Sequence, residues 1–442
     1  MLSSRTIGRG ESGMRLEVGS IHVRDVEVGG RTELTDHILV FDPEEVRSLV
    51  LDDPHFSDVV VRLVKPGESV RIIHALDIVE PRWKARGPGG VFPGFVSPAV
   101  TVGEGRTHRL GGVAVVEVGA PVPGESTVFR ERLIDMAGPG AELTPFARTF
   151  NLVLELRPNM SFFPPGSETM KDYLTGGPES NEYNRAVQAA GLRVAAHLGR
   201  AAREAVPDEA ETFDLGPCDP ALPRVVCLSQ EVTLTPFIYG VRVPLPLGVM
   251  LHPNELFDGA LVRWNRGYVG STYWEQNHRL LIELCRRHGR DLNFLGCIFF
   301  GGVTAAAADK EASSSSVSKM ARMLRADAAM VIGLNGSNHA VDLMLTIQKC
   351  ERAGIKTTLV YNDVGEGPDD PGFIFAVPEA DAIVNAGSRY QTVALPKLRT
   401  VIGGDHLVDP DIDARGELTV PMRYLHGAID PTGHSRLTVR FE

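Results

Sequence analysis

The feature that most constrains the fold is a regular alternation of apolar runs and helical patterns between Leu292 and Val360. The apolar runs suit buried strands, and the segments between them suit amphipathic helices. In chain order we expect a strand ending at Phe300, a helix at 316–324, a strand at 328–332, a helix at 340–353 and a strand at 357–360. This order is typical of a parallel sheet covered by helices. We therefore predict a βαβαβ core at 292–360.

The remainder of the chain changes character near its middle. Residues 14–150 carry short β-branched runs separated by Gly- and Pro-rich turns, and this pattern predicts a mainly β domain. A helical stripe then covers 183–205 and stops before Pro207. A length of 442 residues suits two or three domains. The predicted fold class is α/β, with a mainly β domain at 14–150 followed by an α/β region with a largely parallel sheet at 181–442.

Charge and cysteine content exclude several classes of partner. Lys and Arg number 45 against 56 Asp and Glu, so the net charge of −11 repels polyanions, and neither nucleic acid nor an anionic membrane is an expected partner. The five cysteines show no CxxC or zinc-type spacing, which suits reduced thiols and predicts no metal site. Residues 1–17 fit neither a secretory signal nor a membrane anchor. We expect a cytoplasmic protein.

A second kind of signal is a set of short strings that occur in one order along most of the chain: Met14–Glu17, Lys65–Ile72, Glu80–Arg82, Phe92–Gly94, Gly103–His108, Ile134–Pro139, His252–Glu255, Asp258–Ala260 and Asp309–Ser314. Together they resemble the proprotein of component B of the glycine, sarcosine and betaine reductases, a family that also includes the D-proline reductase proprotein. The resemblance places the family's start at Met14, so residues 1–13 are expected to be an extension or the result of a misplaced start codon.

The resemblance implies an oxidoreductase component that works in a multisubunit complex. In the family the proprotein is cut at a cysteine, which becomes a pyruvoyl group at the new N-terminus. The pyruvoyl carbonyl is thought to form a Schiff base with the substrate amine. A partner subunit that carries a thiol or a selenol then breaks the carbon–nitrogen bond reductively. The expected partners are therefore such a subunit and a small carboxylate ligand.

The chain departs from the family at the cleavage position. Asp258–Ala260 and Asn265 match, but the next residue is Arg266, and no cysteine lies between Cys227 and Cys285. Arginine has no β-heteroatom that can attack the preceding peptide bond and then be eliminated. The sequence therefore predicts an unprocessed chain with no pyruvoyl cofactor. Ser271 is an alternative precursor, through an acyl shift followed by elimination, although its surroundings also suit a loop with aromatic packing.

The resemblance and the charges together nominate site residues. Arg266 and His108 are the candidate catalytic residues, with Arg266 binding a substrate carboxylate in a bidentate manner. The candidate substrate-binding residues are Arg106, Asn265, Ser271, Asp309, Lys310 and Glu311. Three cations among these residues predict a pocket for a small carboxylate. The alternatives are a hydrogen-bonded loop histidine at position 108 and a solvated turn at 309–311.

Three further segments are interpreted from their residue types. Asn335–Asn338 lies between a predicted strand and helix, where it either binds an anion or caps the helix. Ser313–Ser316 is expected to be a polar loop and cap, with a hydroxyl-rich binding turn as the alternative. Apolar segments such as 235–239 suit a protein interface or core packing, and because the resemblance implies a subunit that works with others, we expect an oligomer.

Two functions follow from this reading. One is the substrate-handling subunit of an amino-acid reductase complex, which performs reductive C–N cleavage with its thiol or selenol partner. The alternative is a non-catalytic scaffold or small-carboxylate-binding subunit of a related complex, and the replacement of the cysteine by Arg266 favours it.

Overall fold

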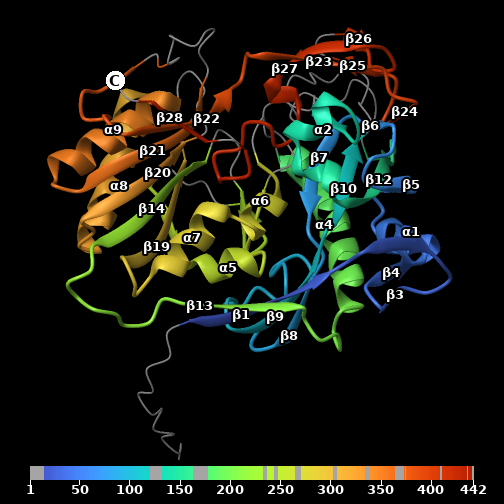
Figure 1. The fold of residues 1–442 in the computed structure, drawn as a ribbon, viewed down its shortest axis with the longest axis horizontal. Helices are drawn as coiled ribbons and strands as arrows, with labels where there is room; N and C mark the ends of the chain where they lie inside the picture. Colours follow the sequence, from blue (N-terminus) through green and yellow to red (C-terminus); the bar gives the residue numbers. More distant parts are fainter. Residues whose placement is uncertain are drawn as a thin grey trace, which may run out of the picture.

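The computed structural model describes residues 14–119, 132–162, 178–231, 236–242, 247–263, 270–301, 306–333, 339–363, 373, 375–408, 411–435 and 437–440. It is an α/β structure whose N-terminal half consists mainly of strands, as the sequence predicts (Figure 1). No helix in the described residues is long and apolar enough to cross a membrane.

A seven-stranded sheet forms the core of the C-terminal half. Its order is β17-β19-β14-β20-β21-β22-β28. The five central strands run parallel, and the two edge strands are antiparallel to their neighbours. The strand bounds are β14 Arg224–Glu231, β17 Val249–Leu251, β19 Asn293–Gly301, β20 Ala328–Gly333, β21 Lys356–Asp363, β22 Ile383–Ser388 and β28 Thr438–Arg440. The predicted βαβαβ core at 292–360 is confirmed, and β14 is inserted between its first two strands.

Helices cover both faces of this sheet, as Figure 1 shows. Val226 and Leu228 of β14 face one apolar cluster with α8 and α9, whereas Cys227 faces another with α5 and α7. The helices are α5 Pro253–Phe257, α6 Thr272–Gln276, α7 Arg279–Arg287, α8 Ala307–Met323 and α9 His339–Arg352. From β14 the chain continues to β19 on one side of this strand and then crosses to β20 on its other side. The carboxyl ends of β14 and β20 therefore form the switch point at which open α/β sheets bind ligands.

Two sequence interpretations in this region are wrong. Helix α8 begins at Ala307 rather than at 316, so Ser313–Ser316 lies in the helix interior and is not a polar loop. The hydroxyl of Ser314 donates to the Lys310 carbonyl oxygen at 2.8 Å, which satisfies it inside the helix. Packing between α8 and α9 therefore overrides the weak helix propensity of serine. Asn335–Asn338 lies outside the described residues.

The described residues of the N-terminal half contribute to four small sheets. Their orders are β13-β1-β9-β8, β5-β12-β10-β7, β11-β6-β24 and β2-β4-β3. The strands are β1 Arg15–His22, β2 Asp25–Val28, β3 Glu33–Thr35, β4 Ile38–Phe41, β5 Phe56–Val64, β6 Val70–Ile72, β7 Ala75–Val79, β8 Arg82–Arg86, β9 Gly105–Gly111, β10 Val113–Gly119, β11 Ile134–Asp135, β12 Phe150–Pro158, β13 Glu209–Asp214 and β24 Thr400–Ile402.

One long helix supports these sheets. Helix α4, Pro178–Arg200, contacts β7, β8 and β10, and it also packs on α1, Pro43–Leu51. Its inward residues include Val187, Ala190 and Val194, all fully buried, which confirms the helical stripe in the sequence. A turn at 201–204 ends the helical segment a few residues earlier than predicted.

The end of the chain returns to the N-terminal half. Strand β24 pairs in parallel with β6. Arg71 of β6 is fully buried, forms an ion pair with Asp135 at 2.7 Å and donates to the carbonyl oxygens of Pro396 and Ala414. The remaining short elements are α2 Pro139–Leu143, β15 Phe237–Ile238, β16 Val241–Arg242, β18 Leu261–Val262, β23 Thr392–Leu395, β25 His406–Val408, β26 Asp411–Asp413 and β27 Leu418–Pro421. The domain limits proposed from sequence remain a prediction.

Candidate functional site

The chain on both sides of residues 264–269 is buried and held by charged side chains. Asn265 and Arg266 themselves lie outside the described residues. Arg263 precedes this segment, and Gly270 and Ser271 follow it and lead into α6. Helix α6 lies between the large sheet and the N-terminal half of the molecule (Figure 1). The geometry of the two flanks therefore defines the surroundings of the candidate site.

Arg263 connects the first flank to the carboxyl end of β14. Its guanidinium pairs with Glu231, the last residue of β14, and with Glu275 of α6. Both carboxyl side chains are at most 2% exposed. Burial raises the pKa of Glu231 to about 7, Arg263 acts in the opposite direction, and Glu275 adds to the increase.

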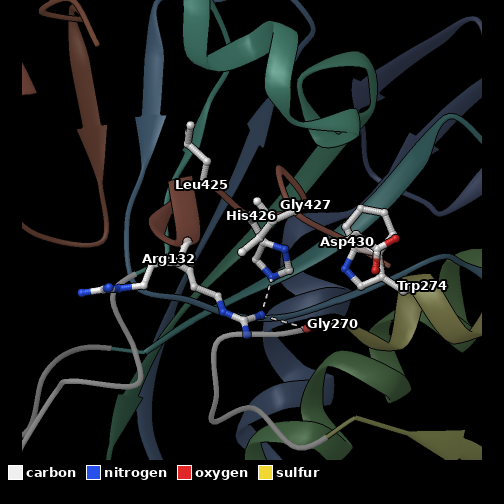
Figure 2. Close-up of a pocket in the computed structure, with 9 residues that line it drawn as sticks. Arg132, Gly270, Trp274, Leu425, His426, Gly427 and Asp430 are labelled. Carbon is white, nitrogen blue, oxygen red and sulfur yellow. Dashed lines mark hydrogen bonds between the residues drawn. The ribbon is translucent and has the colours of Figure 1, made fainter. Parts of the chain in front are cut away.

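Arg132 holds the second flank. It donates to the Gly270 carbonyl oxygen at 2.8 Å and lies 3.3 Å from Nε2 of His426, as Figure 2 shows. Burial, with the nearby Arg132 charge, lowers the pKa of His426 far below its ordinary value, so this imidazole is neutral. The Ser271 side chain is fully buried, and its hydroxyl has no hydrogen-bond partner among the described residues.

The start of α6 is fastened to the N-terminal half. Asp77 of β7 accepts hydrogen bonds from the Thr272 backbone N–H at 2.8 Å, from the Thr272 hydroxyl at 2.6 Å and from Gln188 of α4 at 2.8 Å. Burial raises the pKa of Asp77 to about 6, although these donors oppose the increase. Three elements far apart in the sequence thus meet at one carboxyl group.

The end of α6 is fastened by a second buried network. Arg82 of β8 pairs with Glu80 at 2.7 Å and donates to the Gln276 carbonyl oxygen and to Asn277 Oδ1, each at 2.8 Å. Arg109 donates to the same Asn277 oxygen at 2.8 Å. Both ends of this five-residue helix are therefore fixed by charged side chains from the N-terminal half.

A small pocket opens next to Gly270. It has a volume of about 10 Å³, room for about one water molecule, and is lined by Arg132, Gly270, Trp274, Arg423, Leu425, His426, Gly427, Ile429 and Asp430. Figure 2 shows Arg132 and His426 near its centre and Asp430 and Trp274 together at one side. Burial raises the pKa of Asp430 to about 6. The pocket therefore combines guanidinium cations, a neutral imidazole and a carboxyl group that titrates near neutral pH.

The predicted turn at 309–311 is the first part of α8. Lys310 is 5% exposed and pairs with the fully buried Asp342 of α9 at 3.1 Å. Glu311 pairs with Lys349 of α9. Asp309 lies in the first turn of α8, where a carboxylate suits the helix dipole. The expected turn is wrong because α8 begins at Ala307, nine residues before the start at residue 316 that the sequence predicts.

The predicted turn around His108 is strand β9. His108 is 4% exposed, and its Nδ1 lies 2.9 Å from the Ala202 carbonyl oxygen. Arg106 forms an ion pair with Glu17 of β1 at 2.6 Å and is partly exposed. Among the described residues, no hydrogen bond or ion pair joins either side chain to Arg263, Gly270 or Ser271. Of the predicted site residues that the structure describes, only Ser271 is the chain neighbour of a residue that lines the pocket, Gly270.

Several polar residues of the site were not found from sequence: Arg132, Glu231, Arg263, Glu275, His426 and Asp430. One usable signal existed for Glu231, since carboxyl ends of parallel strands often carry ligand-binding residues. Arg132 and Asp430 are separated from Gly270 by long stretches of sequence, so only the tertiary fold brings them together. No cluster in the described part of the chain has three or more side chains suited to holding a metal ion.

Comparison with known proteins assigns the family. The model of the glycine, sarcosine and betaine reductase component B subunits matches residues 14–421. The chain belongs to this component B family. It is 32% identical to the glycine reductase complex component B subunits alpha and beta of Acetoanaerobium sticklandii, over 97% of this chain and all of that protein. It is 30% identical to the sarcosine reductase complex component B subunit alpha of Peptoclostridium acidaminophilum, again over 97% of this chain and all of that protein. No solved structure matches the chain.

Two strings that carried the resemblance to the component B family contact each other in the structure. Asp258, the C-cap of α5, accepts hydrogen bonds from the Gly103 backbone N–H at 2.8 Å and from the Thr107 hydroxyl, and it pairs with Lys84. The Asp258 and Lys84 side chains are at most 5% exposed. These strings therefore build one buried junction between the N-terminal half and the segment before residue 264.

Proposed function

We propose that this chain is the substrate-handling subunit of an amino-acid reductase complex and that it acts uncleaved, without a pyruvoyl group. One observation carries the proposal: the family match spans residues 14–421. The residue after Asn265 is Arg266, at the position where the resemblance places the family's cleavage cysteine. Its relatives are named as component B of glycine, sarcosine and betaine reductase complexes. The expected reaction class is reductive cleavage of a carbon–nitrogen bond.

Arg266 does not fit the role of a pyruvoyl precursor. Arg266 has no β-heteroatom to attack the preceding carbonyl carbon. Ser271 has one, but among the described residues no base contacts its hydroxyl. We derive no reaction step through this cofactor.

We assign Arg266 a binding role in this proposal. The flanks of its segment are fixed by Arg263 and by the Arg132 hydrogen bond to Gly270, beside the pocket of Figure 2. A guanidinium on a segment anchored in this way can bind a substrate carboxylate through two parallel hydrogen bonds. Asn265 and Ser271 are proposed to bind substrate next to it. The roles assigned to His108, Arg106, Asp309, Lys310 and Glu311 remain predictions.

The proposal also concerns the partners of the chain. Reductive C–N cleavage requires two electrons, and we expect them from a cytoplasmic subunit that carries a redox thiol or selenol. The test is affinity purification of the tagged full chain from its native host, followed by assay of amine release from glycine, sarcosine and betaine with a dithiol reductant. Copurification of a thiol- or selenol-bearing subunit together with amine release is the expected result. Neither partner nor release would contradict the proposal.

A matched pair of arginine variants tests the role of Arg266. Arg266→Ala is expected to weaken carboxylate binding by about 1.5–3 kcal/mol, the range for a hydrogen bond to a charged group, with little change in thermal stability. Arg290→Ala removes an exposed arginine and serves as the control. Calorimetry with the same ligands measures both. An unchanged affinity in Arg266→Ala would make Arg266 a neutral replacement.

The second candidate function is a non-catalytic scaffold or small-carboxylate-binding subunit of a related complex. The missing cysteine favours it, because the family's own chemistry cannot start at Arg266. The purification experiment separates the two functions. A partner that copurifies without any amine release, combined with an Arg266→Ala variant that binds ligands normally, would establish the scaffold.

A further inference from the structure

A groove between α8 and α9 is lined mainly by cations. It has a volume of about 450 Å³, and none of its lining residues belongs to the pocket beside Gly270. Its polar lining residues are Ser315, Ser318, Lys319 and Arg322 of α8 and Lys349 and Arg352 of α9. Within each helix these residues are spaced three or four apart, so each set shares one helix face. Two positively charged helix faces therefore form the walls of this α8–α9 groove.

Carboxylates of the fold already pair with one wall. Lys349 pairs with Glu311 of α8, and Arg352 pairs with Glu379 at 2.9 Å. Both of these cations therefore bind carboxylates in the folded chain itself. They leave the other wall of the α8–α9 groove without a counter-charge.

The α8 wall carries two cations that have no ion pair. Lys319 and Arg322 are both exposed, and in the part of the chain that the structure describes neither side chain forms an ion pair or a hydrogen bond. Glu351 and Asp327 lie near the ends of the two helices, but each pairs with a cation outside the groove. The groove thus has four cations and two paired carboxylates, an excess of two positive charges on a chain whose net charge is −11.

The helix dipole explains only part of this charge. Arg322, Lys349 and Arg352 lie in the last turns of their helices, where cations are favourable. Lys319 lies before the last turn of α8, and the effect of the dipole falls off within that turn. An external anion accounts for all four positions.

The position of the groove suits docking. Helix α8 ends at Met323 and β20 begins at Ala328, so the groove lies next to the amino ends of the parallel strands. Ligands of open α/β sheets bind at the opposite, carboxyl ends. In Figure 1, α8 and α9 lie together on the side of the molecule away from the N-terminal half. A protein bound here leaves the carboxyl edge of the sheet accessible.

We propose that the α8–α9 groove docks an acidic segment of a partner protein, with carboxylates about one helical turn apart. Residues three positions apart on a helix are separated by about 4.5 Å along its axis, so each wall presents two cations at this spacing. A segment with several carboxylates can pair with both walls at once, and it should bind far more tightly than a free carboxylate. This docking is independent of the reaction that the chain performs.

Fluorescence anisotropy of the full chain with a labelled oligoglutamate peptide tests the proposal. We expect binding at low salt in spite of the negative net charge, with an affinity that falls as ionic strength rises. Free glutamate and single-stranded DNA of the same charge are the competitors, and each should displace the peptide only at higher concentrations than unlabelled oligoglutamate. No binding of the peptide would overturn the proposal. Equal competition by free glutamate would replace it with a small-anion site, and equal competition by DNA would replace it with a nucleic-acid site.

Two double variants locate the binding surface. Lys319→Glu combined with Arg322→Glu should weaken oligoglutamate binding roughly tenfold or more. Lys397→Glu combined with Arg399→Glu reverses the same two residue types at exposed positions elsewhere and is the matched control, since the net charge changes equally. An equal loss of affinity in both variants would contradict the assignment.

A measurement on the unaltered chain keeps the test valid if the groove variant does not fold. A carbodiimide joins a lysine amine to a carboxylate that lies in direct contact with it, and mass spectrometry identifies the joined residues. We expect the bound oligoglutamate to be joined to Lys319. Peptide joined only to lysines outside the α8–α9 groove would contradict the proposal.

Discussion

At the scale of single residues, the site depends on buried charges that share partners. Arg263 forms ion pairs with both Glu231 and Glu275, although burial opposes the charges of Arg263 and Glu231. Removing one partner of a buried pair leaves an uncompensated charge, which costs far more than removal of a surface pair. A few buried side chains next to residues 264–269 are therefore expected to contribute most to the stability of the site.

Replacement of Arg263 tests this distribution. Arg263→Met should lower the free energy of unfolding by about 3–5 kcal/mol, because it leaves two buried carboxyl groups unpaired. Arg286→Met breaks an exposed pair with Glu211 and should cost at most about 1 kcal/mol. Urea denaturation measures both variants. A loss for Arg263→Met no larger than that of Arg286→Met would contradict the buried network.

At the scale of elements, helices α8 and α9 show where local sequence patterns mislead. The sequence predicts a loop at Ser313–Ser316, but these residues lie inside α8, which packs against α9. From the sequence, Lys310 is expected either at the surface or in the substrate site. In the structure its side chain pairs with Asp342 of α9. Burial raises the pKa of Asp342, and Lys310 partly offsets this increase. Ionisation of the Asp342 carboxyl group is therefore favoured by its pairing with Lys310.

A pair of substitutions decides whether Lys310 is structural. Lys310→Met should destabilise the fold by about 3–5 kcal/mol, because Asp342 stays buried and unpaired. Lys310→Met combined with Asp342→Leu should recover most of that loss. Thermal unfolding measures the two variants. A single variant as stable as the unaltered chain, but with weakened ligand binding, would return Lys310 to the substrate site.

The sequence predicted elements better than it predicted the site, for a physical reason. Apolar periodicity reports local burial, so the parallel core at 292–360 and helix α4 followed from it directly. The pocket needs Arg132, Gly270 and Asp430 to meet, and no local pattern records such distant contacts. The predicted cationic pocket combined Arg106 of β9 and Lys310 of α8 with Arg266 because all three side chains are positively charged. Charge alone does not show which strands and helices face each other.

At the scale of the whole molecule, both halves of the chain contribute to the same structures. β1 pairs with β9 and β13, and β24 completes the sheet of β6. Asp77 and Arg82 from the first half hold both ends of α6. The site is therefore built across the molecule, so we expect neither half to fold and bind ligands alone.

Assembly is a prediction at this scale. The family resemblance implies a subunit that works with others, and we expect light scattering of the purified chain to show an oligomer. A monomer at micromolar concentration, combined with no partner recovered from the native host, would contradict the reductase-complex proposal. A monomer that recovers its partner would leave the proposal intact and place the interface between different subunits.

The central claim is that this chain acts without being cut. Intact-mass spectrometry of protein purified from its native host, before and after treatment with phenylhydrazine, tests it most directly. We expect one chain, 47.9 kDa if translation starts at Met1, and no mass added by the carbonyl reagent. Two fragments separated near Asn265 or Ser271, the C-terminal one blocked at its N-terminus and reactive towards phenylhydrazine, would contradict the account.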